Sequence, residues 1–264
     1  MKVIKNMFKI LSATCLVGLC ITSMVSAESQ NDQVPARMNA GTVIEYDANN
    51  QMVIVEEGTP VVESNSSLKP LQSNLTPDEQ KALEEENEFV NKIKAEAANY
   101  PVYKIENPAP QPGLRVEYDG EGYIKQFLIQ DNGGFIPFAY KALPRGTRKP
   151  AGTYTYGNHN NTITISNSSV LGVGRITNFT DKTGENDNTL GRGDAATRGD
   201  IDNPEYDTEL RVRNLDNDET GNVNKRDNGA LPDAVLDLWK TTVEDFGVDW
   251  SKSVSFSGRY YYSF

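Results

Sequence analysis

The chain has 264 residues, a formal net charge of −11 and 37% hydrophobic residues, which suits one ordinary domain with an accessory region. An acidic chain lacks the basic surface that nucleic-acid binding requires, and anionic lipid surfaces repel it. We therefore expect neither nucleic acid nor a membrane surface as a partner.

Residues 1–27 have the pattern of a secretory signal peptide. Three lysines among the first nine residues form a basic start, residues 10–25 are mostly apolar, and small residues allow cleavage before Glu28. The apolar run is short for a membrane span of ~20 residues, although a retained anchor is the alternative. Removal of three lysines and no acidic residue takes the formal charge from −11 to −14. We expect a secreted protein without a membrane contact after cleavage.

The two cysteines, Cys15 and Cys20, both lie in this leader segment. The exported chain would then contain no cysteine, which excludes disulfides and thiol catalysis. Its fold has to depend on core packing alone.

Residues 28–150 form a predicted accessory region with two hairpins. Residues 41–47 (GTVIEYD) and 113–119 (GLRVEYD) are near copies, and each precedes a turn and a second apolar run. Because an isolated hairpin is marginal in water, we expect the two to pair with each other or with the rest of the chain.

A helix over residues 76–98 is predicted between these hairpins. Thr76 and Glu79 form a capping box, with Pro77 at the first helical position. The acidic run Glu84–Glu86 is expected to remain solvated on its polar face.

Residues 151–264 form a predicted domain of short strands. The expected strands cover residues 153–156, 162–165, 170–179, 210–215 and 254–262. The polar segment 181–200 is expected to be a surface loop. Many short strands with little helix predict a small β-barrel.

Residues 209–247 carry a series of short motifs in a distinctive order. They are the turn Asn214–Asn217, the box Asp227–Ala230, the apolar run Val235–Leu238 around Asp237, and a short helix 241–246. This series resembles the double-psi β-barrel of rare lipoprotein A-like and expansin-like proteins, over about residues 170–264. The resemblance implies a mainly β chain, with a six-stranded double-psi β-barrel at the C-terminus after a small α+β accessory region.

The same resemblance implies action on cell-wall polysaccharide. The expected partner is peptidoglycan, which a lytic transglycosylase-like protein of the cell wall binds or cleaves. By resemblance Asp227 is the acid and base, and Asp237 supports it. Glycan contacts are expected from Thr177, Asn228, Trp239 and Tyr261, with no cofactor and no metal.

Departures from the family pattern keep other functions open. The family places a His before its first alternating strand, whereas residues 195–204 contain none, and His159 is expected to be an exposed turn residue. This difference favours a non-catalytic, expansin-like module that binds or loosens the wall. A third alternative is an exported structural or adhesion protein, since Arg-Gly-Asp occurs at residues 192–194 and 198–200. The sequence does not indicate the oligomeric state.

The two aspartates also have purely structural interpretations. Asp227 has the position of a turn residue that caps backbone amides, and Asp237 that of a buried residue holding the start of the following helix. The sequence leaves these interpretations open beside the functional ones.

Overall fold

Two antiparallel hairpins and one further strand build a five-stranded sheet in the computed structural model, which describes residues 33–61, 76–138, 141–250 and 254–264. Its strands are ordered β2 (Met52–Glu56), β1 (Val43–Tyr46), β4 (Leu114–Tyr118), β5 (Ile124–Asp131) and β6 (Gly134–Pro137). The predicted hairpins pair through β1 and β4, where Ile44 lies opposite Val116. One face of this sheet buries a small apolar core that includes both residues.

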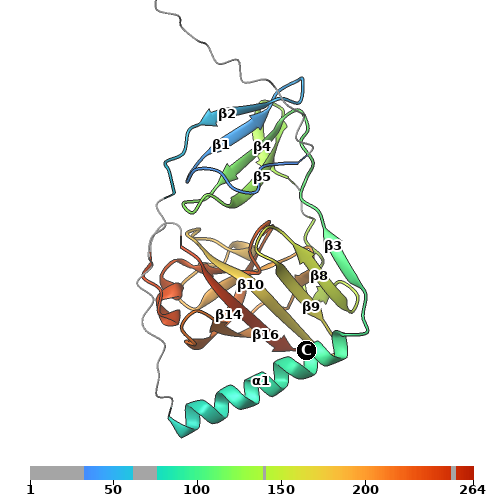
Figure 1. Ribbon diagram of the computed structural model, residues 1–264, viewed down its shortest axis with the longest axis vertical. Coiled ribbons are helices and arrows are strands. Elements are labelled where there is room, and N and C mark those ends of the chain that lie inside the picture. Colours follow the sequence, from blue (N-terminus) through green and yellow to red (C-terminus); the bar gives the residue numbers. More distant parts are fainter. Residues whose placement is uncertain (1–32, 62–75, 139–140, 251–253) are drawn as a thin grey trace, which may run out of the picture. The chain divides into compact units, whose positions relative to one another are not determined.

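Six strands close into a mixed β-barrel (Figure 1). In order around the ring they are β10 (Ser169–Phe179), β15 (Leu236–Trp239), β11 (Asp194–Arg198), β14 (Thr220–Gly229), β13 (Glu209–Asn214) and β16 (Phe256–Ser263). The β10–β15 and β11–β14 pairs are parallel, and the other four pairs are antiparallel. The predicted mainly β fold with a six-stranded barrel is confirmed.

Alternation along the strands fills the barrel interior. Residues such as Ile176, Leu236 and Leu238 belong to one buried apolar cluster, and their neighbours in sequence project outward. Burying a large apolar side chain stabilises a fold by roughly 1.5–3 kcal/mol, so this cluster supplies much of the driving force.

The remaining strands extend or flank the barrel. Continuing from β10, the sheet adds β9 (Asn161–Ile165), β8 (Gly152–Tyr156) and β3 (Val102–Ile105). A separate pair consists of β7 (Thr147–Arg148) and β12 (Asp202–Asn203), and η1 (Glu185–Asp187) and η2 (Lys240–Phe246) are short 3-10 helices. Strand β3, before the predicted domain boundary at residue 150, pairs with β8 after it. That boundary stays a prediction.

The predicted surface loop over residues 181–200 is wrong in its second half. Residues 194–198 form β11, a buried strand of the barrel. The polar composition of this segment suggested an exposed loop, but its charged side chains can be buried because they have partners close by in the chain. Asp194 accepts a hydrogen bond from the Gly191 amide, and Arg198 bonds to Asp200 across the turn that follows. Arg198 is only 1% exposed, so the second Arg-Gly-Asp tripeptide does not present its arginine at the surface.

The predicted helix is confirmed as α1 (Pro77–Ala97), with the capping box between Thr76 and Glu79 in place. Glu86, however, is not solvated as expected but 5% exposed. Its carboxylate accepts hydrogen bonds from Arg213 of β13 and Arg259 of β16, at 2.8–3.0 Å. Helical periodicity alone misses this because the partners come from strands far along the chain.

Within the described residues no helix is long and apolar enough to cross a membrane. The predicted signal peptide, residues 1–27, lies outside the described residues.

The buried Glu86 is expected to fix α1 to the barrel. Removing one partner of a buried ion pair leaves uncompensated charge and costs about 3–5 kcal/mol, so Glu86→Ala should lower the free energy of unfolding by that order. Glu85→Ala is the matched control, because Glu85 is exposed and its pair with Lys81 is worth at most about 1 kcal/mol. Urea unfolding measures both, and equal losses would contradict the assigned anchor.

Candidate functional site

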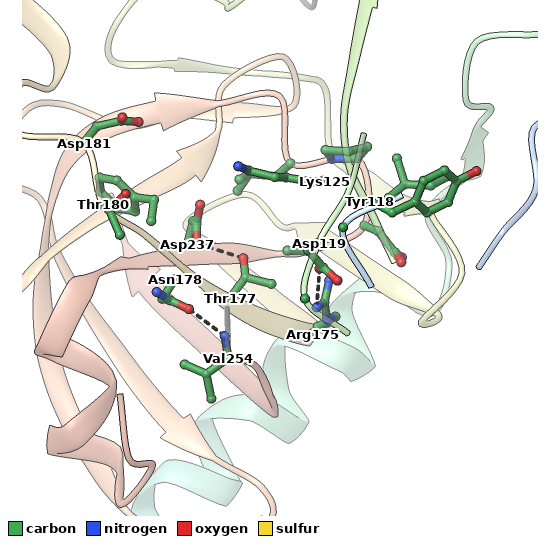
Figure 2. Close-up of a pocket in the computed structure, with 18 residues that line it drawn as sticks. Tyr118, Asp119, Lys125, Arg175, Thr177, Asn178, Thr180, Asp181, Asp237 and Val254 are labelled. Atoms are coloured by element: carbon green, nitrogen blue, oxygen red, sulfur yellow. Dashed lines mark hydrogen bonds and ion pairs between the residues drawn. The ribbon is translucent and has the colours of Figure 1, made fainter. Parts of the chain in front are cut away.

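A pocket of ≈ 300 Å³, lined by both polar and apolar residues, lies beside β10 and β15 of the barrel (Figure 2). The end of β10, the segment before β15 and β15 itself form one wall, and the turn between β4 and β5 forms another. The side chains that the argument uses are Asp119, Lys125, Arg175, Thr177, Asp181, Asp233 and Asp237.

Asp237 occupies its place because of strand alternation. Leu236 and Leu238 point into the barrel core, so Asp237 between them points outward to the pocket. On β10, Thr177 is its direct partner, and the Thr177 Oγ1 donates a hydrogen bond to the Asp237 Oδ1 at 2.8 Å. The parallel pairing that closes the barrel therefore also orients this carboxyl group.

The pocket holds Asp237 as a weak acid. Burial raises the pKa of Asp237 to about 7, and the hydrogen bond from Thr177 opposes that rise. Arg175 and Lys125 also lower the pKa, whereas the nearby Asp181 raises it. An aspartic acid with this pKa carries a proton over much of the neutral range and is suited to general acid catalysis.

The two predicted aspartates share one row across the barrel wall. Asp227 on β14 and Asp237 on β15 both pair with Ala196 on β11, the strand between them. Directly opposed residues project on the same face. With strands ~4.8 Å apart, the two backbones are separated by roughly 10 Å.

Asp227 is a weaker candidate than Asp237. Burial raises its pKa, and the carboxylates of Asp181 and Glu185 add to that rise. The backbone amides of Asn228 and Glu185 lower it, and Asp227 does not line the pocket. Part of its environment thus matches the structural interpretation of an aspartate held by backbone amides.

The other predicted glycan contacts are scattered. Thr177 lines the pocket. Asn228, on β14, pairs with the buried Thr197 of β11 and does not line the pocket. Trp239 donates its indole N–H to the Asp181 carbonyl oxygen at 2.8 Å, which places it beside the pocket rim. Tyr261 packs on Phe89 of α1, with ring centroids 5.0 Å apart, and so does not join the pocket.

A buried ion cluster, not foreseen from the sequence, joins the β4–β5 turn to the barrel. Arg175 donates hydrogen bonds to Asp119 at 2.6 Å and to Glu121 at 2.5 Å. Its Nε also donates to Ser255 at 3.0 Å. The turn Asp119–Gly122 was visible in sequence, but nothing in its pattern pointed to an arginine on a distant strand. This cluster sets the pocket wall that carries Lys125.

The expectation that His159 is simply exposed is wrong. Its side chain is 26% exposed, and its Nδ1 lies 2.8 Å from the buried Asp233 Oδ2. The ring also contacts Tyr123 edge-on, with centroids 4.1 Å apart. The Asn158 amide and the Asn161 side chain hydrogen-bond to the same carboxylate. In the sequence, the Asn-rich turn was the one signal of this polar network. Asp233 lines the pocket, so its contacts place the turn next to the pocket.

Another buried carboxyl group with a raised pKa, that of Asp202, lies outside the pocket lining. Asp202 is fully buried and accepts a hydrogen bond from the Tyr262 hydroxyl at 2.6 Å. Burial raises the pKa of Asp202 to about 6, against the opposing effects of Tyr262 and Arg148. Asp202 therefore titrates in a range that overlaps that of Asp237.

Comparisons with protein-family models, with curated proteins and with solved structures find no match to this chain. Among the residues that the structure describes, no three His, Cys, Asp or Glu side chains group as metal ligands. The resemblance to rare lipoprotein A-like and expansin-like domains stays a prediction, and the site is judged by its own chemistry.

The raised pKa values predict that stability falls with rising pH. An unfolded aspartate releases its proton near pH 4, whereas folded Asp202 and Asp237 hold theirs to about pH 6 and 7. The free energy of unfolding should therefore decrease from about pH 4 to 7. Thermal unfolding at pH 5 and pH 8 measures the drop, which Asp202→Asn and Asp237→Asn should each reduce. Exposed Asp131→Asn is the control, and an undiminished drop in both buried variants would contradict these pKa values.

Proposed function

We propose that this chain is an exported cell-wall protein that cleaves the glycan strands of peptidoglycan, in the manner of a lytic transglycosylase. The observation that carries the proposal is the Asp237 carboxyl group, which lines the pocket and has its pKa raised to about 7. A glycosidic bond needs a proton on its leaving oxygen, and a carboxylic acid with this pKa is a suitable donor.

The barrel is proposed to be of the double-psi type. Its two parallel pairs, β10–β15 and β11–β14, are joined by the antiparallel contact between β11 and β15. This mixed order supports the type that the motifs of residues 209–247 suggest. Fold by itself does not determine function, so the activity rests on Asp237 and its neighbours.

The proposed reaction uses Asp237 first as an acid and then as a base. Its proton passes to the glycosidic oxygen as the bond between that oxygen and the anomeric carbon breaks. A hydroxyl group of the same sugar then attacks the anomeric carbon and gives its proton to the Asp237 carboxylate, which restores the acid. No water is consumed, and the product carries an internal anhydro ring.

The neighbours of Asp237 take supporting roles. Thr177 fixes the orientation of the carboxyl group, and Asp181 favours its protonated form. Asp227, across Ala196 in the same row, is proposed to bind sugar hydroxyls instead of transferring the proton.

Digestion of purified peptidoglycan with the exported protein tests this assignment. The wild type should release anhydro-sugar products detectable by mass spectrometry, and Asp237→Asn should lower their rate by about 100-fold or more, the usual loss of a general acid. Asp227→Asn should weaken binding to the pellet more than it slows turnover, and exposed Asp131→Asn should change neither.

The other outcomes separate the alternatives. Pellet binding without products would replace cleavage with a non-catalytic, expansin-like function, which the missing family His favours. A protein that neither binds nor releases products would leave the structural or adhesion interpretation. For adhesion, the second Arg-Gly-Asp tripeptide could not contribute its arginine, because Arg198 is buried.

The pH profile provides an independent test of the acid. Since Asp237 must be protonated, the rate should fall as pH rises through about 7. Lys125 is an exposed cation that lowers the pKa of Asp237, so Lys125→Gln should move the alkaline limb to higher pH. Lys149→Gln, a substitution outside the pocket lining, is the control. An unchanged profile in Lys125→Gln would contradict Asp237 as the titrating group.

A further inference from the structure

Among the strands that the structure describes, the apolar strand β2 has a neighbour on one side only. It forms one end of the five-stranded sheet, and its residues Met52, Val53, Ile54 and Val55 are all 45–52% exposed. Exposed edge strands usually carry lysine, proline or another device against pairing, because their free backbone groups attract another strand. Within Met52–Val55 no side chain is charged and none is proline.

The backbone of β2 is regular enough to pair with another strand along its open side. The Gln51 carbonyl oxygen accepts a hydrogen bond from the Asp47 amide, so by alternation Val53 directs its backbone toward β1. Met52 and Ile54 then direct their N–H and C=O groups to the open side. The bulge in the β1–β2 pair begins only beyond Ile54, which leaves Met52–Ile54 regular.

We propose that β2 is a dimerisation strand, which pairs antiparallel with β2 of a second copy about a two-fold axis at Val53. In this register Met52 of each copy lies opposite Ile54 of the other, and their backbone groups exchange both hydrogen bonds. Val53 meets its own copy at the axis. The five-stranded sheets of the two copies become one continuous ten-stranded sheet.

The order of charged and polar residues along β2 makes the strand complementary to itself in this register. Pairing about Val53 places Glu56 opposite Asn50, so no carboxylate faces another carboxylate or an apolar side chain. A shift to an axis at Val55 would set Glu56 against Ile54 and Glu57 against Val53. That register would bring carboxylates beside apolar side chains, which is unfavourable.

The net charge gives the association a characteristic salt dependence. Each copy carries a formal charge of −11, and of −14 without residues 1–27, so the two repel one another at long range. Salt screens that repulsion and leaves backbone pairing and apolar contact intact. Dimerisation should therefore become stronger with added sodium chloride, whereas an interface of ion pairs would become weaker.

Analytical ultracentrifugation of the protein purified after export tests the proposal. Over a concentration series the wild type should approach twice the mass of a single chain, and more readily at high salt. Ile54→Lys should return it to the single-chain mass. Ile136→Lys on β6, the opposite edge of the same sheet, is a matched control, because the two isoleucines are 47% and 46% exposed. A wild type that stays at the single-chain mass at every concentration overturns the proposal, whatever the variants do.

A thiol placed at the axis tests the register. Cα atoms of a non-hydrogen-bonded antiparallel pair are ~4.5 Å apart, within the range that a disulfide spans. Val53→Cys, in a chain with Cys15 and Cys20 changed to serine, should therefore form a disulfide-linked dimer under mild oxidation. Val102→Cys on the free edge of β3 is the control and should not. Equal cross-linking of both variants would overturn the register, and circular dichroism shows whether each remains folded.

Discussion

The pairing of β10 with β15 is the constraint on which the rest of this structure depends. It closes the six-stranded ring, so that the described strands of the barrel have neighbours on both sides. Because the pairing is in register at Thr177 and Asp237, the contact that closes the barrel also places the candidate acid. Stability and chemistry are thus coupled at one pair of strands.

The pocket keeps Asp237 in a state that an exposed aspartate would not adopt. Its neighbours in sequence are core leucines, which fix the strand and hold the carboxyl group at a partly closed surface. The resulting rise in its pKa destabilises the folded state at high pH. A fold that keeps such a group, with a hydrogen-bond donor aimed at it, is consistent with a chemical role.

The five-stranded sheet contributes to the site as well as to its own core. The ion cluster of Arg175 with Asp119 and Glu121 fixes the β4–β5 turn against the barrel end. Without the small sheet, Asp237 would be more exposed to water and its pKa closer to that of a free aspartate. The same sheet has β2 at one edge, so one accessory element is proposed both to complete the site and to join two copies.

Local patterns in the sequence were enough to predict the local elements, because capping boxes, turns and alternation act between near neighbours. The helix over residues 76–98 was predicted from its capping box of Thr76 and Glu79, and the two hairpins were predicted from their turns and apolar runs. Asp237 was recognised as a candidate, but its outward orientation was not predicted. Three features became visible only in the folded chain: the burial of Glu86, the barrel strand over residues 194–198 and the contact of Asp233 with His159. Those contacts join residues far apart in the chain. A charged side chain meets such a partner only after folding, so no local sequence pattern can predict the contact.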